Sequence, residues 1–197
     1  MLEYKLKRII LFVCFIISLM VITGPAASME LKIATLSPEG SPWMQKMRQG
    51  AATIAVKTAN RVRFKFYPGG IMGNDRAILR KIRIGQLHGG ALTGGSLSQV
   101  FSDAQVYSLP LKFRSLAEID YVRKRMDQML IDGYEKGGFV TFGLAEGGFA
   151  YVMSKKPVRR IDELRNQKVW IPDYDLTISE AMNTFGIKPI PLSIVDV

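Results

Sequence analysis

The chain has 197 residues, of which 48% are hydrophobic and 22% charged, and its formal net charge is +10. This length allows one large domain or two small lobes, and the apolar fraction excludes a generally disordered chain. The single cysteine excludes an intrachain disulfide. The basic charge leaves nucleic acid, an anionic membrane surface and acidic ligands as partners to weigh.

The N-terminus has the pattern of a secretory signal peptide. Lys5 and Arg8 belong to a positively charged start, and an uncharged apolar run follows over Ile9–Ile22. Small residues at 24–28 then break the helix and offer a cleavage site. We expect residues 1–28 to be removed on export to the periplasm. The alternative is an uncleaved membrane anchor, although a membrane span usually needs about 20 apolar residues.

Removal of this segment changes the chemistry available to the mature chain. Cys14 lies inside the apolar run, so the mature chain would contain no thiol for catalysis or metal binding. Export also argues against a nucleic-acid partner, and the basic clusters lack the interleaved aromatic side chains of such a surface. We interpret these clusters, at 80–83, 123–125 and 155–160, as solvated helix faces or turns.

The first half of the mature chain alternates extended and helical patterns. Ser41 is a helix N-cap with Pro42 at the first helical position, and Asn74 can cap a second helix. The predicted elements are a strand over 31–35, a helix from 41, a strand over 61–67, a helix over 74–84, a strand over 89–93 and a loop at 94–95. This order predicts an α/β fold with parallel strand pairs.

The second half continues the alternation. Ser115 and Glu118 form a capping-box pattern that begins a long helix. Two extended runs joined through glycines indicate either a hinge between lobes or a plain hairpin or bulge. The predicted elements are an apolar segment over 108–113, a helix over 115–138, strands over 139–144 and 149–154, a helical turn over 161–164, a strand over 168–171, a helix over 176–185 and an extended run over 187–191.

The sequence lacks the residues that most enzyme mechanisms need. His88 is the only histidine, and we interpret it as structural. Gly69–Gly73 is glycine-rich but lacks the Lys-Ser/Thr of a phosphate-binding loop. Asp173 and Asp175 precede a helix, where carboxylates cap helices more often than they act as acid and base. An enzyme is therefore the poorer hypothesis, and we expect no metal and no cofactor.

An ordered set of short motifs resembles a known family. The DctP-type substrate-binding proteins of tripartite ATP-independent periplasmic (TRAP) transporters show similar motifs in this order and spacing, and the resemblance covers residues 30–197. The motifs are SPEGSPW (37–43), FYPGGIMG (66–73), SLPLKF (108–113), GGF (147–149), KP (156–157), DEL (162–164), KVWIP (168–172) and FGIKPIPLS (185–193).

The resemblance implies a two-lobed, periplasmic-binding-protein-like α/β fold. Residues 29–146 would form the first lobe and residues 147–197 the start of the second. A small organic solute, usually an acid, would bind in the cleft between them, and a monomeric protein would deliver it to a TRAP-type membrane permease. Relatives continue beyond Val197, so we expect a truncated chain with an incomplete second lobe. The alternatives are a sensory binding protein for a signalling receptor and a periplasmic enzyme.

Two positions depart from the family pattern. Trp170 stands where relatives normally carry an arginine that pairs with the ligand carboxylate, and Ala150 stands where a second arginine often follows. These departures argue against a simple mono- or dicarboxylate and favour an aromatic, cationic or largely apolar ligand, with stacking or cation–π contacts. Alternatively, Trp170 merely packs within the second lobe.

The remaining candidate residues fall on loops expected at the rim of the cleft. Trp43 is either a ligand platform or part of the core face of the first helix. Loops at the carboxyl ends of strands are where ligands bind in sheets of this kind. The other candidates for ligand contact are Glu39, Asp75, Thr93, Gly94, Glu146 and Asp175.

Overall fold

The computed structural model describes residues 28–197. The predicted signal peptide lies almost wholly outside the described residues, so its cleavage stays a prediction. Within the described part, no helix has the length and apolar character needed to cross a membrane.

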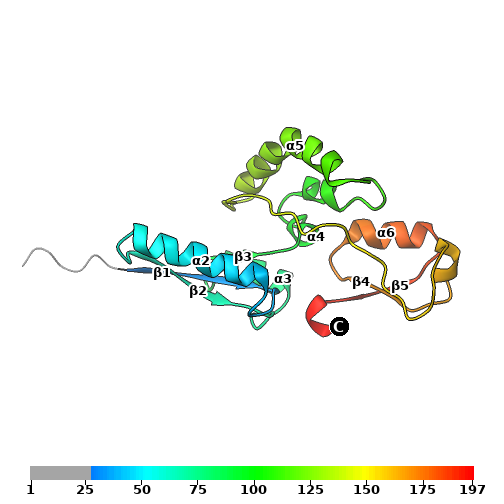
Figure 1. Cartoon of the computed structure of the whole chain (residues 1–197), viewed down its shortest axis with the longest axis horizontal. Helices are drawn as coiled ribbons and strands as arrows, with labels where there is room; N and C mark the ends of the chain where they lie inside the picture. Colours follow the sequence, from blue (N-terminus) through cyan, green and yellow to red (C-terminus); the bar gives the residue numbers. More distant parts are fainter. Residues whose placement is uncertain (1–27) are drawn as a thin grey trace, which may run out of the picture.

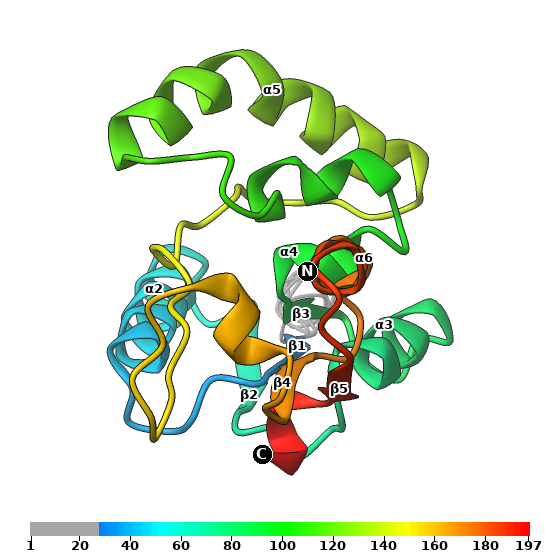
Figure 2. The same ribbon diagram turned by 90° about the vertical axis from the view of Figure 1, so that its right-hand side faces the viewer.

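The first lobe is built on a three-stranded parallel sheet of order β2-β1-β3. Helices α2 and α3 lie on opposite faces of this sheet (Figure 2). The chain adds β2 on one side of β1 and then crosses over to add β3 on the other side. The switch point of the sheet therefore lies between β1 and β3. The elements are β1 (Met29–Thr35), α2 (Pro42–Lys57), β2 (Val62–Tyr67), α3 (Asp75–Arg83) and β3 (Gly89–Ala91).

Local sequence accounts for these elements. The Ser41 hydroxyl accepts a hydrogen bond from the Met44 N–H at 3.3 Å and begins α2. The Asn74 side chain accepts one from the Ala77 N–H at 3.0 Å and begins α3. One hydrophobic cluster, built on Ala34, Ile78 and Leu87, joins the sheet to α3. These observations confirm the strands and helices predicted for this lobe.

The middle of the chain packs as a helical unit above the junction of the two sheets (Figure 1). Its core consists of Ala104, Leu130 and Tyr134, which are buried against one another. The predicted loop at Gly94 and Gly95 is wrong, because these residues begin a short helix. The elements are α4 (Gly94–Leu97), the 3-10 helix η1 (Ser102–Ser108) and α5 (Leu116–Lys136).

The predicted strands over 139–144 and 149–154 are not formed. Residues 139–160 contain no strand and run from the end of α5 to the second sheet (Figure 1). A strand requires a hydrogen-bonded partner, and no described strand pairs with this segment. Phe139 and Leu144 pack against the core of the helical unit, but other apolar side chains are open to solvent, with Phe142 101% and Met153 93% exposed. Gly143 and Gly148, at φ of 139° and 90°, also interrupt the extended backbone.

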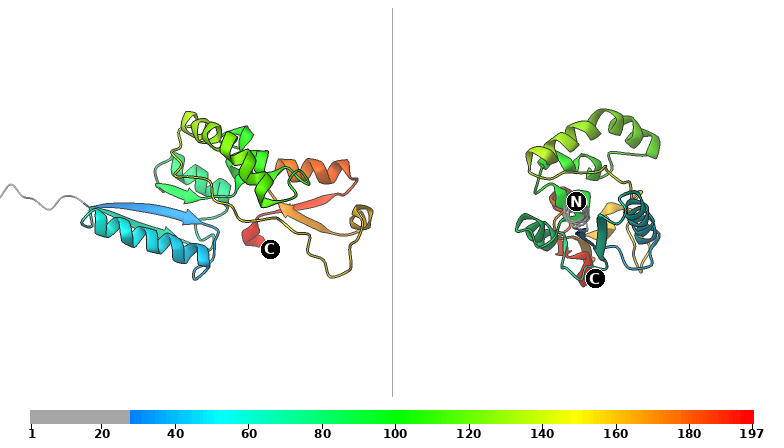
Figure 3. Two further views of the ribbon diagram at one scale, coloured as in Figure 1. Left: turned by 45° about the horizontal axis from the view of Figure 1, so that its top comes forward. Right: turned by 90° about the vertical axis from the view of Figure 1, so that its left-hand side faces the viewer.

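The second lobe contains two parallel strands joined through a helix, as predicted. β4 and β5 pair in register, with Trp170 opposite Ile190. The strands of the two sheets point toward each other, so their carboxyl ends meet at α4 (Figure 3). The elements are η2 (Ile161–Leu164), β4 (Val169–Pro172), α6 (Leu176–Thr184), β5 (Pro189–Leu192) and η3 (Ile194–Asp196).

Candidate functional site

Four of the predicted site residues converge around α4, at what we call the lobe junction. Asp75 follows β2, Thr93 and Gly94 follow β3, and Asp175 follows β4. Each therefore stands at the carboxyl end of a parallel strand, where α/β sheets place their ligands. The lobe junction comprises Asn74, Asp75, Thr93–Ser96 and Gln105 on one side, and Tyr174, Asp175 and Thr177 on the other.

The Asp75 carboxylate ties the first turn of α3 to the start of α4. Its Oδ2 accepts hydrogen bonds from the Thr93 N–H at 3.0 Å, the Thr93 hydroxyl at 2.6 Å and the Ser96 hydroxyl at 2.7 Å. Asp75 is only 2% exposed. Its second oxygen, Oδ1, is buried and has no hydrogen-bond partner among the described residues. Half of a buried carboxylate is therefore left without a donor.

Asp175 approaches α4 from the second lobe. Its Oδ1 accepts a hydrogen bond from the Ile178 N–H at 3.0 Å and so caps α6. Its Oδ2 lies against Gly95, where a Cβ would stand 3.3 Å from that oxygen. Asp175 is 8% exposed, and this burial raises the pKa of its carboxyl group. A glycine at position 95 thus lets a second buried carboxylate reach α4.

Two hydrogen bonds that the sequence did not reveal join the lobes directly. The Asn74 side-chain amide donates to the Tyr174 hydroxyl at 2.9 Å, and the Thr177 hydroxyl donates to Gln105 Oε1 at 2.6 Å. Asn74 was predicted only as a helix cap. Its Oδ1 fulfils that role while its Nδ2 reaches across the junction, and a sequence pattern reveals only the first of these contacts.

Glu39 and Trp43 lie away from this cluster. The Arg48 guanidinium donates to both carboxylate oxygens of Glu39, at 2.9 and 2.6 Å, in an exposed bidentate pair. This bonding holds the pKa of Glu39 below its ordinary value. Trp43 is 42% exposed, and its neighbour Met44 is the buried residue of α2. The core alternative for Trp43 is therefore wrong, and its role as a ligand platform stays a prediction.

Glu146, Ala150 and Trp170 also make their contacts elsewhere. Glu146 lies 3.9 Å from the Arg123 guanidinium on α5, and Ala150 is exposed. The Trp170 indole N–H donates to the Leu192 carbonyl at 3.0 Å, across the two strands of the second sheet. The one polar group of this side chain is therefore used inside the lobe, but the side chain is 37% exposed, so a stacking role of the ring stays a prediction.

The chemistry of the junction is that of binding. Among residues 28–197, no group of three or more histidine, cysteine, aspartate or glutamate side chains is placed to hold a metal ion. His88 accepts a hydrogen bond at Nδ1 from the Lys32 N–H at 3.0 Å beside the first sheet, in agreement with a structural role. The junction instead offers carboxylates, hydroxyls and an amide, which orient polar solutes.

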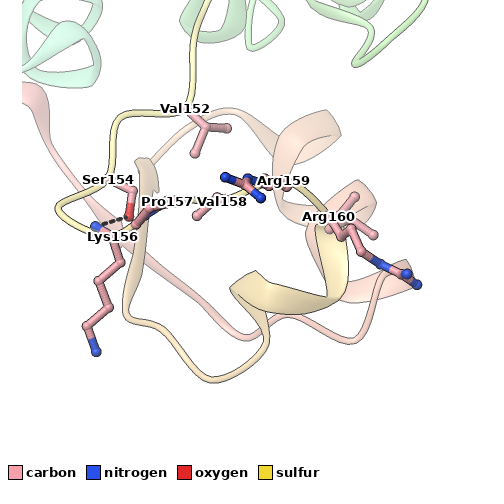
Figure 4. A pocket seen from close by; sticks show the side chains of 8 residues that line it. Val152, Ser154, Lys156, Pro157, Val158, Arg159 and Arg160 are labelled. Atoms are coloured by element: carbon pink, nitrogen blue, oxygen red, sulfur yellow. Dashed lines mark hydrogen bonds between the residues drawn. The ribbon is translucent and has the colours of Figure 1, made fainter.

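A surface hollow of about 420 Å³ lies away from the junction, along residues 152–161. Figure 4 shows that the side chains of Lys156 and Arg160 extend outward in different directions, and only Arg159 leans across the hollow. Because its charged groups do not converge on one point, this hollow has no arrangement that would orient a ligand.

The raised pKa of Asp175 predicts a pH-dependent effect of Asp175→Asn. Above the ordinary pKa of 3.8 the unfolded state releases this proton while the folded state keeps it, so the wild type loses stability as pH rises through the folded pKa. Asparagine does not titrate and can still cap α6. We therefore expect the variant to gain stability relative to the wild type between about pH 4 and about pH 7 in urea denaturation.

The control is Glu39→Gln. The Arg48 bonds lower the pKa of Glu39, so the wild-type carboxylate adds stability above its ordinary pKa and loses it as pH falls. This variant should lose stability relative to the wild type over the same pH interval. If both variants gain stability relative to the wild type over this interval, or both lose it, the assignment of Asp175 as the buried carboxyl is contradicted.

These features define a class of protein. Two parallel α/β sheets that face each other through the carboxyl ends of their strands form the two-lobed architecture of the periplasmic binding proteins, as predicted. The family of bacterial extracellular solute-binding proteins, family 7 (DctP), matches residues 33–197. The chain belongs to this family. Its members are binding proteins rather than enzymes, which agrees with the non-catalytic interpretation of the sequence.

The individual relatives are distant and longer. The chain is 24% identical over 147 residues to the uncharacterized protein YiiZ of Salmonella typhimurium, covering 73% of this chain and 45% of YiiZ. It is 22% identical over 177 residues to the sialic acid-binding periplasmic protein SiaP of Vibrio cholerae, covering 87% and 54%. The chain thus spans about half the length of the curated relatives it matches.

A solved structure shows the same fold. The TRAP periplasmic solute-binding protein of Sulfurospirillum deleyianum, determined with bound succinate, superposes with a TM-score of 0.78 at 20% sequence identity. The alignment covers 86% of this chain and 55% of the solved one. The two-lobed fold predicted from the motifs is confirmed.

Proposed function

We propose that the protein is an exported solute-binding protein that captures a small organic acid between its lobes and delivers it to a TRAP-type membrane permease. The family match over residues 33–197 carries this proposal. Residues 1–28 would direct export to the periplasm, and residues 29–146 and 147–197 would supply the two sides of the cleft. Relatives that bind sialic acid and succinate support an organic acid as the solute.

The lobe junction supports ligand capture at this place. Polar side chains from both lobes meet at the carboxyl ends of β2, β3 and β4. The Asn74–Tyr174 and Gln105–Thr177 hydrogen bonds link the side chains of the two lobes directly, and opening would break them. A solute that bonds to both lobes would favour the closed arrangement. A closed, loaded protein would then offer the permease a surface distinct from that of the open one.

A thermal-shift screen of the exported chain tests this function. The set contains succinate, sialic acid, D-glucuronate and amino acids, and each is compared with the same buffer without the solute. A solute present at 100 times its Kd stabilises the folded state by about 2.7 kcal/mol. For a chain of this size that corresponds to a rise in Tm of about 5–10 °C. If no acid in the set raises Tm, the proposed function is contradicted.

A further inference from the structure

One turn of the second lobe contacts three elements on the other side of the junction. This turn, residues 174–177, leads from β4 into α6, and we call it the clasp. The Tyr174 hydroxyl accepts a hydrogen bond from the Asn74 side-chain amide, at the start of α3, at 2.9 Å. The Thr177 hydroxyl donates to Gln105 Oε1 on η1 at 2.6 Å. Two hydrogen bonds therefore fix one short segment at two separate points across the junction.

The third contact of the clasp is a close steric fit. Asp175 Oδ1 accepts from the Ile178 N–H at 3.0 Å, which holds the carboxyl group against the start of α6. Its Oδ2 lies against Gly95 on α4, where a Cβ would stand 3.3 Å from that oxygen. Because the helix cap restrains the carboxyl group, this approach depends on the absence of a side chain at position 95. The clasp thus combines two hydrogen bonds with one close contact.

The two lobes do not share a hydrophobic core. Among residues 28–197, one hydrophobic cluster draws on residues from 34 to 92 and the other on residues from 97 to 144, so neither spans the junction. The second lobe has its own buried apolar residues, Leu164, Ile171 and Ile187. A single net hydrogen bond changes an equilibrium constant by only about twofold to tenfold. A junction that depends on such bonds can open without unfolding either lobe.

The chain segment that connects the lobes permits such opening. Residues 139–160 form no helix and no strand. The Arg123 guanidinium donates to the Leu144 carbonyl at 2.7 Å, so the connection is fixed to α5 as far as that residue. Beyond it, Gly148 has a φ of 90° and the side chains of residues 150–153 are exposed. Residues 147–153 are therefore the part of the connection whose backbone can rotate most easily.

We infer that the clasp holds the lobes together before any solute is present, and that Tyr174 and Thr177 set how often the cleft opens. Both are positioning residues, because they act on solute capture through the arrangement of the lobes. A solute enters when their two bonds break and residues 147–153 rotate. The bearing on solute capture rests on the proposed function, whereas the clasp itself is tested on the protein without solute.

The distance between two spin labels in the exported chain, without solute, tests this inference. Lys46→Cys on α2 and Asn183→Cys on α6 provide exposed labelling positions on the two lobes, and Cys14→Ser removes the natural cysteine. Double electron–electron resonance then measures the distribution of distances. We expect one main distance with the wild-type clasp, which matches the closed lobes of this structure. Tyr174→Phe combined with Thr177→Val should add a longer distance and raise the open-to-closed ratio by about tenfold or more.

A third variant and two controls separate the clasp from general effects of substitution. Gly95→Ala should also favour the longer distance, because its Cβ would crowd the carboxyl group of the clasp. Tyr121→Phe removes an exposed tyrosine hydroxyl on α5. Thr184→Val removes a hydroxyl whose bond, to the Glu180 carbonyl at 2.9 Å, stays within α6. Neither control should change the distance distribution.

Urea denaturation of each variant shows whether it is folded. If the double variant does not fold, the single substitutions Tyr174→Phe and Thr177→Val replace it, and each should raise the open-to-closed ratio at least about twofold. Folded variants with the wild-type distance distribution overturn the inference. A wild type that already shows mainly the longer distance overturns it as well, since the clasp would then not hold the lobes together.

The outcomes also separate this inference from the proposed function. If an acid binds in the thermal-shift screen but the clasp variants leave the distances unchanged, the inference fails alone. If the distances change as expected but no acid binds, the clasp stands and the proposed function fails.

Discussion

Replacing Gly133 with alanine should destabilise the folded chain by about 1–3 kcal/mol, the usual cost of overpacking a filled core. Gly133 lies on the buried face of α5, and a Cβ there would overlap three carbons of the Phe101 ring. That ring cannot turn aside freely, because it packs edge-on against Tyr134 with centroids 6.5 Å apart. The free energy of unfolding from urea denaturation measures the loss.

The matched control is Gly50→Ala in α2. Gly50 is an exposed helical glycine, and an added Cβ would meet no heavy atom within 4 Å. Alanine should therefore stabilise the chain by about 0.8–1 kcal/mol through its better helix propensity. Opposite signs for the two glycine substitutions would confirm that the Phe101 contact, rather than helix propensity, decides the effect at position 133. A stabilising Gly133→Ala would show that α5 and η1 do not pack closely.

The elements that the sequence predicted correctly carry their own local signals. Ser41, Asn74, Ser115 and Asp175 each cap a helix through a side-chain oxygen, as their position before an apolar pattern indicates. At α5 the capping box is altered, since Glu118 accepts from the Arg114 N–H at 2.8 Å. Such caps depend on residues within a few positions of one another, so sequence patterns contain them.

The errors arise where structure depends on distant partners. Residues 139–154 are rich in apolar residues, but they form no strand because no described strand lies beside them to accept their hydrogen bonds. Gly94 and Gly95 read as a loop, yet they begin α4 because Asp75 binds Thr93 and Ser96 at its start. A residue about 20 positions earlier in the chain thus decides this local conformation.

The site was predicted in part for a related reason. Parallel strands bring their carboxyl ends together, so Asp75, Thr93, Gly94 and Asp175 could be placed by topology alone. The contacts across the junction, such as that of Asn74 with Tyr174, depend on the relative orientation of two lobes. Trp170 shows the converse, because its indole N–H is used by Leu192 of the adjacent strand. This bond from Trp170 to Leu192 depends on the pairing of β4 with β5, which the KVWIP motif (168–172) does not reveal.

Asp75→Ala should produce a large loss of stability, on the order of 3 kcal/mol or more. The substitution removes the acceptor for the Thr93 N–H, the Thr93 hydroxyl and the Ser96 hydroxyl. The two hydroxyls lie 2.8 Å apart and can bond to each other, which leaves the backbone N–H without its partner. Hydrogen bonds to a carboxylate are stronger than those between neutral groups. Removing them should therefore cost more stability than removing the neutral hydrogen bonds of an ordinary turn.

Two further variants distinguish this network from a general effect of charge removal. Asp75→Asn keeps an oxygen that can accept from Thr93 and Ser96, so its loss in the urea-derived free energy of unfolding should be intermediate. Asp103→Ala removes an exposed carboxylate that accepts one bond, from the Ser102 hydroxyl at 3.2 Å, and should change stability by no more than about 0.5 kcal/mol. If Asp75→Ala is as mild as Asp103→Ala, the carboxylate does not hold α4 in place. The lobe junction would then be arranged by backbone packing alone, and Asp75 would be free to serve a ligand with both oxygens.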